Sequence, residues 1–278
     1  MSDLDRKRSA TKTGLGDEGE QQCQPQSSLA DLVVEPEDQE ETRRFNDQLG
    51  RTLHETEAEV RRIDASAAAP SRGRSWERAR EVVEEFRPVP WFIWRMANYV
   101  FGQPGQCNEL SEGMVFGLRR LMFATASDPV LGVGEKVNDS RRALKIVPPD
   151  VVAAVSVVHA VCRRMRGRPF ERIWRPILDD ALLRARIGHL VGSNDPGFSA
   201  GRGMLAGFAG RCGLVILIAS GNLDQARLAL EMLASGTPIS VVGADIYECE
   251  PLQVSALTLS AAGCGRDAAF GTGAYALR

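Results

Sequence analysis

The sequence predicts an all-α protein in which a compact helical domain follows a polar N-terminal region. Of the 278 residues, 44% are hydrophobic, so the chain can bury a sizeable core. The apolar residues recur at helical spacing, between Pro, Gly, Ser, Asp and Asn residues that are typical of helix ends. No segment alternates between apolar and polar residues for more than a few positions. VVAAVSVV and LVILIA have a strand-like composition, but each lies within a longer helical segment.

Residues 1–74 are expected to form a disordered acidic N-terminal region and linker. They are rich in Gln, Glu, Ser and Asp and have few large apolar residues, so ordering them buries little apolar surface. Residues 37–63 have a helix-forming composition and are a possible isolated helix, which would be marginal in water. A solvated tail and a helix that folds against a partner are both open. The apolar stripe of this segment is thin and consists of Phe45, Leu49, Leu53, Val60 and Ile63.

Residues 75–278 are expected to form the folded domain. Ser75 is a candidate N-cap for its first helix, and Asp150, after two prolines, is a candidate N-cap for a later one. Pro90 at the start and Gly102 just past the end bound the second helix. The expected helices cover residues 75–86, 90–102, 110–124, 150–165, 169–192, 200–220, 222–236 and 250–263.

The cysteines and the apolar segments bear on the cellular compartment. The six cysteines include no CxxC pair and follow no apolar leader, so neither a zinc knuckle nor a secreted disulfide framework is indicated. A reducing, cytoplasmic location is therefore expected. The longest apolar segments, near residues 151–161 and 214–219, are shorter than the roughly 20 residues of a membrane span, so no membrane insertion is expected.

Several short motifs follow one another in a specific order between residues 86 and 270. They are FRPVP (86–90), SRRAL (140–144), IWRPIL (173–178) followed by Ala181, GFAGRCG (207–213), GADIY (243–247) and EPLQV (250–254). In their order and spacing they resemble the HDOD domain, the non-hydrolytic relative of the HD phosphohydrolases in bacterial signalling proteins.

The resemblance implies an HDOD-like helical domain over residues 75–278 that is not an enzyme. In HD enzymes the run GLLHDIG carries the metal-binding His-Asp pair, and Gly210 and Arg211 stand at the corresponding positions here. The upstream histidine would lie near Arg175 or Pro176, which supply no ligand either. The resemblance thus implies no catalytic residue, no metal and no cofactor. It implies a scaffold that binds a regulatory protein of a two-component or cyclic-dinucleotide pathway, with a divergent phosphohydrolase as a less favoured alternative.

A cluster of basic residues provides the candidate binding residues. Glu171, Asp179 and Asp180 offset its charge only in part, and Arg184 and Arg186 follow further along the chain. Such a cluster could bind an acidic protein surface, a nucleotide or a nucleic acid. It could also be a solvated face that pairs with the acidic run EPEDQEE of this chain. The candidate binding residues are Arg163, Arg164, Arg166, Arg168, Arg172 and Arg175.

The remaining candidate residues are expected to be structural. His159 lies in an apolar helix and is expected in the core, whereas His189 is expected to interact with helix-terminal carbonyls. Cys212 follows Arg211 but is expected to be a buried, inert thiol. The run GRGMLA (201–206) fits GxGxxA, but it follows a polar turn instead of a strand. Its small residues are better explained by close approach of helices.

Overall fold

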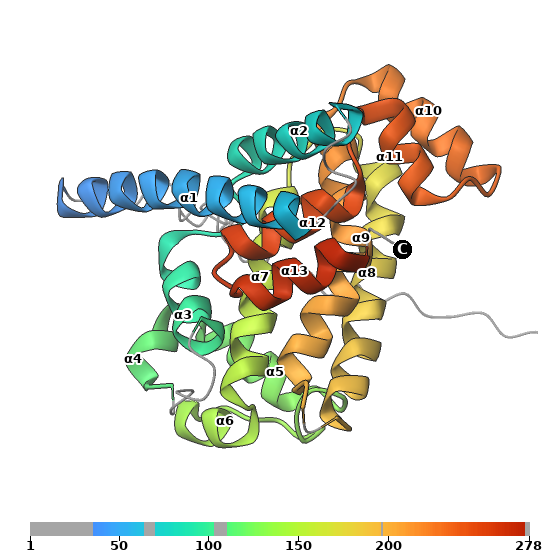
Figure 1. Ribbon diagram of the computed structural model, residues 1–278. Helices are drawn as coiled ribbons and strands as arrows, with labels where there is room; N and C mark the ends of the chain where they lie inside the picture. Colours follow the sequence, from blue (N-terminus) through green and yellow to red (C-terminus); the bar gives the residue numbers. More distant parts are fainter. Residues whose placement is uncertain (1–35, 64–69, 103–109, 196, 276–278) are drawn as a thin grey trace, which may run out of the picture. The chain divides into compact units, whose positions relative to one another are not determined.

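The computed structural model describes residues 36–63, 70–102, 110–195 and 197–275, and no residue in these ranges forms a strand. The prediction of an all-α protein is therefore confirmed (Figure 1). The chain divides into two units, residues 1–39 and 40–278, and the second contains α1 from Glu40 onward and every later helix. The helices are α1 (Pro36–Ile63), α2 (Pro70–Phe86), α3 (Trp91–Phe101), α4 (Glu112–Val115), the 3-10 helix η3 (Phe116–Leu118), α5 (Arg119–Ser127), α6 (Ser140–Ile146), α7 (Pro149–Met165), α8 (Glu171–Ser193), α9 (Ala200–Ser220), α10 (Leu223–Ala234), α11 (Ile239–Tyr247), α12 (Pro251–Ala261) and α13 (Arg266–Tyr275).

Helix α9 forms the centre of the second unit. Every residue from Cys212 to Ala219 is buried. The helix contacts α8, α7 and α12 most extensively, and it also touches α2, α10, α11 and α13. Figure 1 shows α8 and α9 lying side by side. A helix that is apolar on all sides must be surrounded by other elements, so the rest of the domain is arranged around α9.

Glycines bring the backbones of α8 and α9 into direct contact. A Cβ atom at Gly203 would lie 2.0 Å from the carbonyl oxygen of Gly188, and one at Gly188 would lie 2.1 Å from that of Gly203. A Cβ atom at Gly207 would lie 2.1 Å from the carbonyl oxygen of Arg184. No side chain fits at such distances, because van der Waals contact needs more than 3 Å. The structural explanation of the GRGMLA run is thus confirmed.

Helix α9 has 21 residues and is longer than the apolar segment 214–219 within it. Among the described residues it is the one helix that is long and apolar enough to cross a membrane, or one of two if the sharply bent pair of α6 and α7 is counted as one span. In the fold, 72% of its apolar window is buried against other helices. The length and composition of α9 are therefore explained by its packing.

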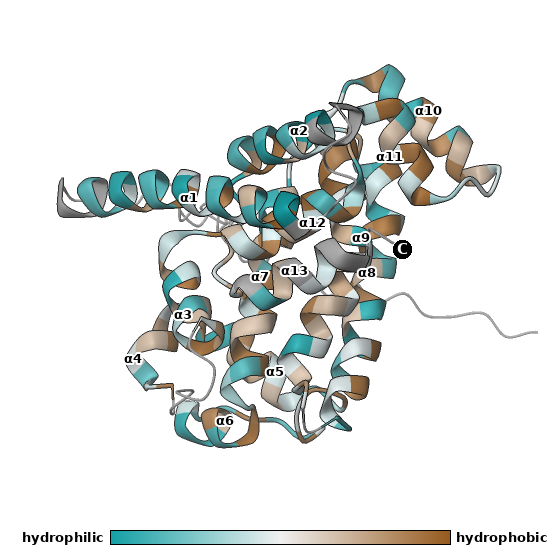
Figure 2. Cartoon of the chain, viewed as in Figure 1, coloured by the Kyte–Doolittle hydropathy of each residue, from teal (hydrophilic) through white to brown (hydrophobic). Residues whose placement is uncertain are grey.

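Helix α1 confirms the helix expected over residues 37–63, but it is not isolated. Leu49, Leu53 and Val60 are buried in the main hydrophobic core. The hydroxyl groups of Thr56 and Ser260 lie 2.6 Å apart and share a hydrogen bond between α1 and α12. Figure 2 shows that most of α1 is hydrophilic, which is why its sequence resembles a solvated segment. The expectation of disorder over residues 1–35 lies outside the described residues.

Two of the expected helix caps are wrong. Helix α2 begins at Pro70, so residues 70–74 are helical and Ser75 lies within the helix. The Ser75 hydroxyl donates to the side chain of Gln253 and accepts from the backbone N–H of Glu250 at 3.1 Å, which ties α2 to α12. Pro148 is the N-cap of α7, and Asp150 instead accepts from the N–H of Gly201 at 2.7 Å. Both side chains serve tertiary contacts. The helix expected over residues 110–124 is divided into α4, η3 and α5.

The contact between α8 and α9 predicts opposite effects of the same substitution at two positions of α9. Gly203→Ala should lower the free energy of unfolding by at least about 2 kcal/mol, because the new methyl group must separate two backbones. Gly210→Ala is the matched control, since nothing lies within 4 Å of a Cβ atom at Gly210. It should raise the free energy of unfolding by about 0.5–1 kcal/mol through helix propensity. Urea denaturation of both variants measures the two values, and equal effects would contradict the contact.

Candidate binding surfaces

The predicted basic residues come together around the turn between α7 and α8. Arg163 and Arg164 lie in the last turn of α7. Arg166 and Arg168 lie in the connection, which turns back through two residues with left-handed backbone conformation, Gly167 (φ 78°) and Phe170 (φ 63°). The remaining two residues, Arg172 and Arg175, lie in the first turns of α8. We call these six residues the basic cluster.

A further arginine, Arg87, adds positive charge at the basic cluster, although the sequence does not indicate it as a member. Partial burial and then the positive charges of Arg168 and Arg87 lower the pKa of Arg164 from its ordinary value. Arg87 directly follows α2 and has a left-handed backbone (φ 50°). Since it is remote from the other arginines in sequence, only the packing of α2 near the α7–α8 turn could reveal it. Like charges are therefore held close together at this surface.

Arg175 differs from the other members of the basic cluster because it forms ion pairs. Arg175 lies 3.1 Å from Asp179 and 3.6 Å from Glu171, both on α8. Within the described residues, none of the other five arginines forms an ion pair. The guanidinium of Arg168 lies over the ring of Phe86, 5.6 Å from its centroid. The positive charge of the surface is thus mostly uncompensated in the described part of the chain.

The proposed pairing with the acidic run of the N-terminal region has no support among the described contacts. Residues 36–39 belong to the first unit, and residue 35 lies outside the described ranges. Glu40 forms its described ion pair with Arg44, one turn along α1, at 2.5 Å. This pair is exposed and local, and such pairs contribute little to stability.

Gly210 and Arg211 lie on α9, and Arg211 takes part in an ion-pair group with α8. Its Nε atom lies 2.8 Å from Oδ2 of Asp180, and Nε of Arg184 lies 2.9 Å from the same oxygen. Burial would raise the pKa of Asp180, but hydrogen bonds from Arg184 and Arg211 outweigh it and lower the pKa below its ordinary value. Asp180 therefore joins α8 to α9.

The structure shows the surroundings of Cys212 and of the residues that could bind a metal ion. Cys212 is buried, and burial raises the pKa of its thiol well above the ordinary value, as expected for an inert cysteine. Within the described ranges, no group of three or more His, Cys, Asp or Glu residues is arranged to hold a metal ion.

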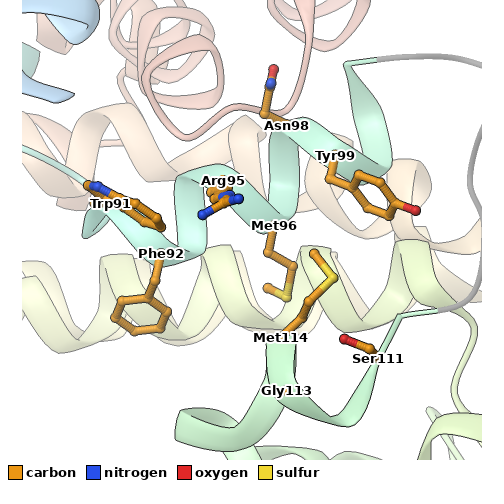
Figure 3. Close-up of a pocket in the computed structure, with 9 residues that line it drawn as sticks. All are labelled: Trp91, Phe92, Arg95, Met96, Asn98, Tyr99, Ser111, Gly113 and Met114. Atoms are coloured by element: carbon orange, nitrogen blue, oxygen red, sulfur yellow. The ribbon is translucent and has the colours of Figure 1, made fainter. Parts of the chain in front are cut away.

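A second surface, which we call the α3–α4 pocket, was not indicated by the sequence analysis. It has a volume of about 830 Å³ and lies between α3 and the start of α4, as Figure 3 shows. Met96 and Met114 point toward one another there. Phe92 and Tyr99 are 48% and 41% exposed, which is high for aromatic side chains. The remaining lining residues are Trp91, Arg95, Asn98, Ser111 and Gly113.

The composition of the α3–α4 pocket is typical of protein interfaces, which are enriched in aromatic residues, Met and Arg. The guanidinium of Arg95 lies over the ring of Trp91, 5.2 Å from its centroid. The signal in the sequence is the density of such residues in WFIWRMANY (91–99), which the helical pattern conceals because exposed and partly buried aromatic residues lie between buried aliphatic ones there.

Comparison of the chain with protein-family models, with curated proteins and with solved structures finds no match.

The two histidines of the folded domain differ from the expectations in detail. His159 is only partly buried, and burial together with the charges of Arg166 and Arg163 lowers its pKa. His189 is 7% exposed, and its Nδ1 atom has no hydrogen-bond partner in the described part of the chain. Burial lowers the pKa of His189, and a hydrogen bond with the backbone of Val130 opposes this shift only in part. His189 is therefore a buried histidine that interacts with the α5–α6 connection, and not with the carbonyls at the end of α8.

These shifts predict that the protein loses stability when the solution is mildly acidified. The folded-state pKa of His189 lies below its unfolded value of about 6.5, so the unfolded chain takes up the proton first. Stability is therefore complete above this value and decreases as the pH falls through the folded-state pKa. His189→Gln should make the decrease shallower in urea denaturation at a series of pH values. His54→Gln, at an exposed position of α1, is the control for the loss of a histidine. A wild-type slope in the His189 variant would contradict the assignment.

Proposed function

We propose that this protein is a non-catalytic regulator of bacterial signal transduction that binds an acidic surface of another signalling protein through the basic cluster. The observation that carries the proposal is that Arg163, Arg164, Arg166, Arg168 and Arg172 form no ion pair in the described part of the chain. The resemblance of the sequence to the HDOD domain supports the scaffold role. The α3–α4 pocket supplies a second surface of interface-like composition.

Binding of an acidic partner stabilises the basic cluster more than it would stabilise the same arginines placed far apart. Its members lie close enough for their charges to lower the pKa of Arg164, so they repel one another in the unbound protein. An acidic partner removes this repulsion and also gains charge-assisted hydrogen bonds, which are about twice as strong as neutral ones. Complementary charge of this kind mainly speeds association and selects the partner.

A second candidate function is a sensor that binds a nucleotide or nucleic acid at the same residues. It is favoured by the arginine content, because the planar guanidinium matches a phosphate group with two parallel hydrogen bonds. Arg168 adds an arginine that lies over an aromatic ring and is therefore oriented. Binding of this kind weakens steeply with salt, in proportion to the number of phosphates contacted.

The two functions are separated by one set of variants scored in two assays. The cluster variant changes Arg163, Arg166 and Arg172 to Gln, because all three are exposed and carry no packing role. The matched control changes three exposed arginines outside the cluster to Gln, namely Arg43, Arg62 and Arg227. Immobilised wild type, cluster variant and control are used to capture proteins from a bacterial extract. The same three proteins are titrated with a cyclic dinucleotide and with a single-stranded oligonucleotide at several salt concentrations.

A partner that is captured by wild type and control, and binds the cluster variant roughly tenfold more weakly, is the expected result. Capture of the same proteins by all three chains would contradict the proposal. Tight, salt-dependent binding of the oligonucleotide or the cyclic dinucleotide that only the cluster variant loses would favour the sensor.

A further inference from the structure

A cavity lies between α9, α12, α13 and the end of α3, and we call it the α9–α13 cavity. Its volume of about 450 Å³ falls within the range of ligand sites, about 300–1,000 Å³. Helix α13 lies beside α12 in Figure 1 and also touches α9. The cavity shares no described lining residue with the basic cluster or the α3–α4 pocket. Its described lining residues are Phe101, Phe198, Arg202, Leu205, Ala206, Gly210, Leu252, Leu259, Cys264, Asp267, Ala268, Gly271 and Thr272.

Most of the described lining of the α9–α13 cavity is apolar. It includes the buried side chains of Phe101, Leu205 and Leu259. Burial raises the pKa of the Cys264 thiol well above its ordinary value, so this side chain is uncharged and acts as a small apolar group. The hydroxyl of Thr272 donates to a carbonyl oxygen of its own helix at 2.9 Å. Water makes few hydrogen bonds in such a space, which therefore favours an apolar ligand.

Two glycines at the cavity differ from those that bring helices together. Gly210 lies in α9 and Gly271 in α13, and nothing lies within 4 Å of a Cβ atom built at either position. Cβ atoms at Gly203 and Gly213 would instead meet the backbone of another helix. Glycine inside a helix is destabilising relative to alanine, and at Gly210 and Gly271 no close helix contact requires it. Their absent side chains leave open space at the cavity.

The charged side chains in the described lining of the cavity are Arg202 and Asp267. Arg202 is partly buried and forms no ion pair with any described residue, Asp267 included. Asp267 is exposed, so water can hydrate its carboxylate. A guanidinium matches a carboxylate with two parallel hydrogen bonds. The charge that complements Arg202 inside this apolar lining is therefore the carboxylate of a ligand.

We infer that the α9–α13 cavity is a binding site for a small apolar carboxylate of the fatty-acid class. Its hydrocarbon chain lies among the apolar side chains of α9 and α12, and its carboxylate binds the guanidinium of Arg202. The negative charge of Asp267 at the same cavity opposes binding and lowers the affinity. The site is independent of the proposed function, because it shares no residue with the basic cluster.

The test measures binding of three probes to the full chain by isothermal titration calorimetry, at constant ionic strength and below the concentrations at which the probes form micelles. Decanoate has both the hydrocarbon chain and the carboxylate, and it is expected to bind. Decanol lacks the charge and should bind roughly tenfold more weakly or less well still. Butyrate keeps the charge but buries far less apolar surface, so no binding is expected.

Three variants test the position and the charge of the bound ligand. Arg202→Gln should weaken binding of decanoate roughly tenfold or more, because it removes a charge-assisted contact. Asp267→Asn should strengthen binding several-fold, because it removes a repelling charge. Gly210→Leu should weaken binding at least tenfold by filling the cavity. Its midpoint of urea denaturation should equal or exceed that of wild type, since the new side chain enters open space.

Two matched controls keep the interpretation specific. Arg227→Gln changes an exposed arginine of α10, and Gly50→Leu changes a glycine of α1 at which a Cβ atom also has nothing within 4 Å. Both should bind decanoate as wild type does. The inference is overturned if decanoate does not bind, if decanol binds as tightly, or if Arg202→Gln and Gly210→Leu bind like the controls. A lower denaturation midpoint of Gly210→Leu would also overturn it, because the leucine would then meet occupied space.

Discussion

The fold depends on the contact of two backbones along α8 and α9, at Gly188 and Gly203. The same principle applies on another side of α9, where a Cβ atom at Gly213 would lie 1.8 Å from the carbonyl oxygen of Pro251. There the hydroxyl of Ser255 accepts from the N–H of Gly213 at 2.8 Å and donates to the carbonyl oxygen of Ala209 at 2.6 Å. Because α9 touches α8 and α12 through its backbone, apolar side chains fill the space around these contacts.

This packing determines where the binding surfaces lie. Asp150 accepts from Gly201 and thereby holds the first turn of α7 at the first turn of α9. With α8 fixed along α9, the chain must reverse between α7 and α8, and the reversal brings arginines from both helices together. Arg163, Arg164, Arg166 and Arg172 are exposed there.

The sequence predicts the fold class and the arginine cluster well, because helical periodicity and local clustering are properties of short segments. It does not predict that α1 packs into the core, since the apolar stripe around Leu53 is thin. The free energy that such a stripe contributes depends on the surface of the other helices against which it packs. Helices α6, α11 and α13 were recognised only as motifs or not at all, because they are short or contain glycine. Ser75 and Asp150 were assigned to helix caps by residue type, yet tertiary partners compete for the same oxygen atoms. Arg87 could not be assigned from sequence, because its role depends on contacts between distant segments.

Helices α8 and α9 meet at one backbone contact on which the rest of the domain is built. The most direct test is a double-mutant cycle between Gly188→Ala and Gly203→Ala, with the free energy of unfolding measured by urea denaturation. Each methyl group alone must separate the same two backbones, and once they are separated the second methyl group adds little. We expect the double variant to be more stable than the sum of the single effects by more than about 1 kcal/mol. Strict additivity of the two substitutions, or a negligible effect of each, would contradict it.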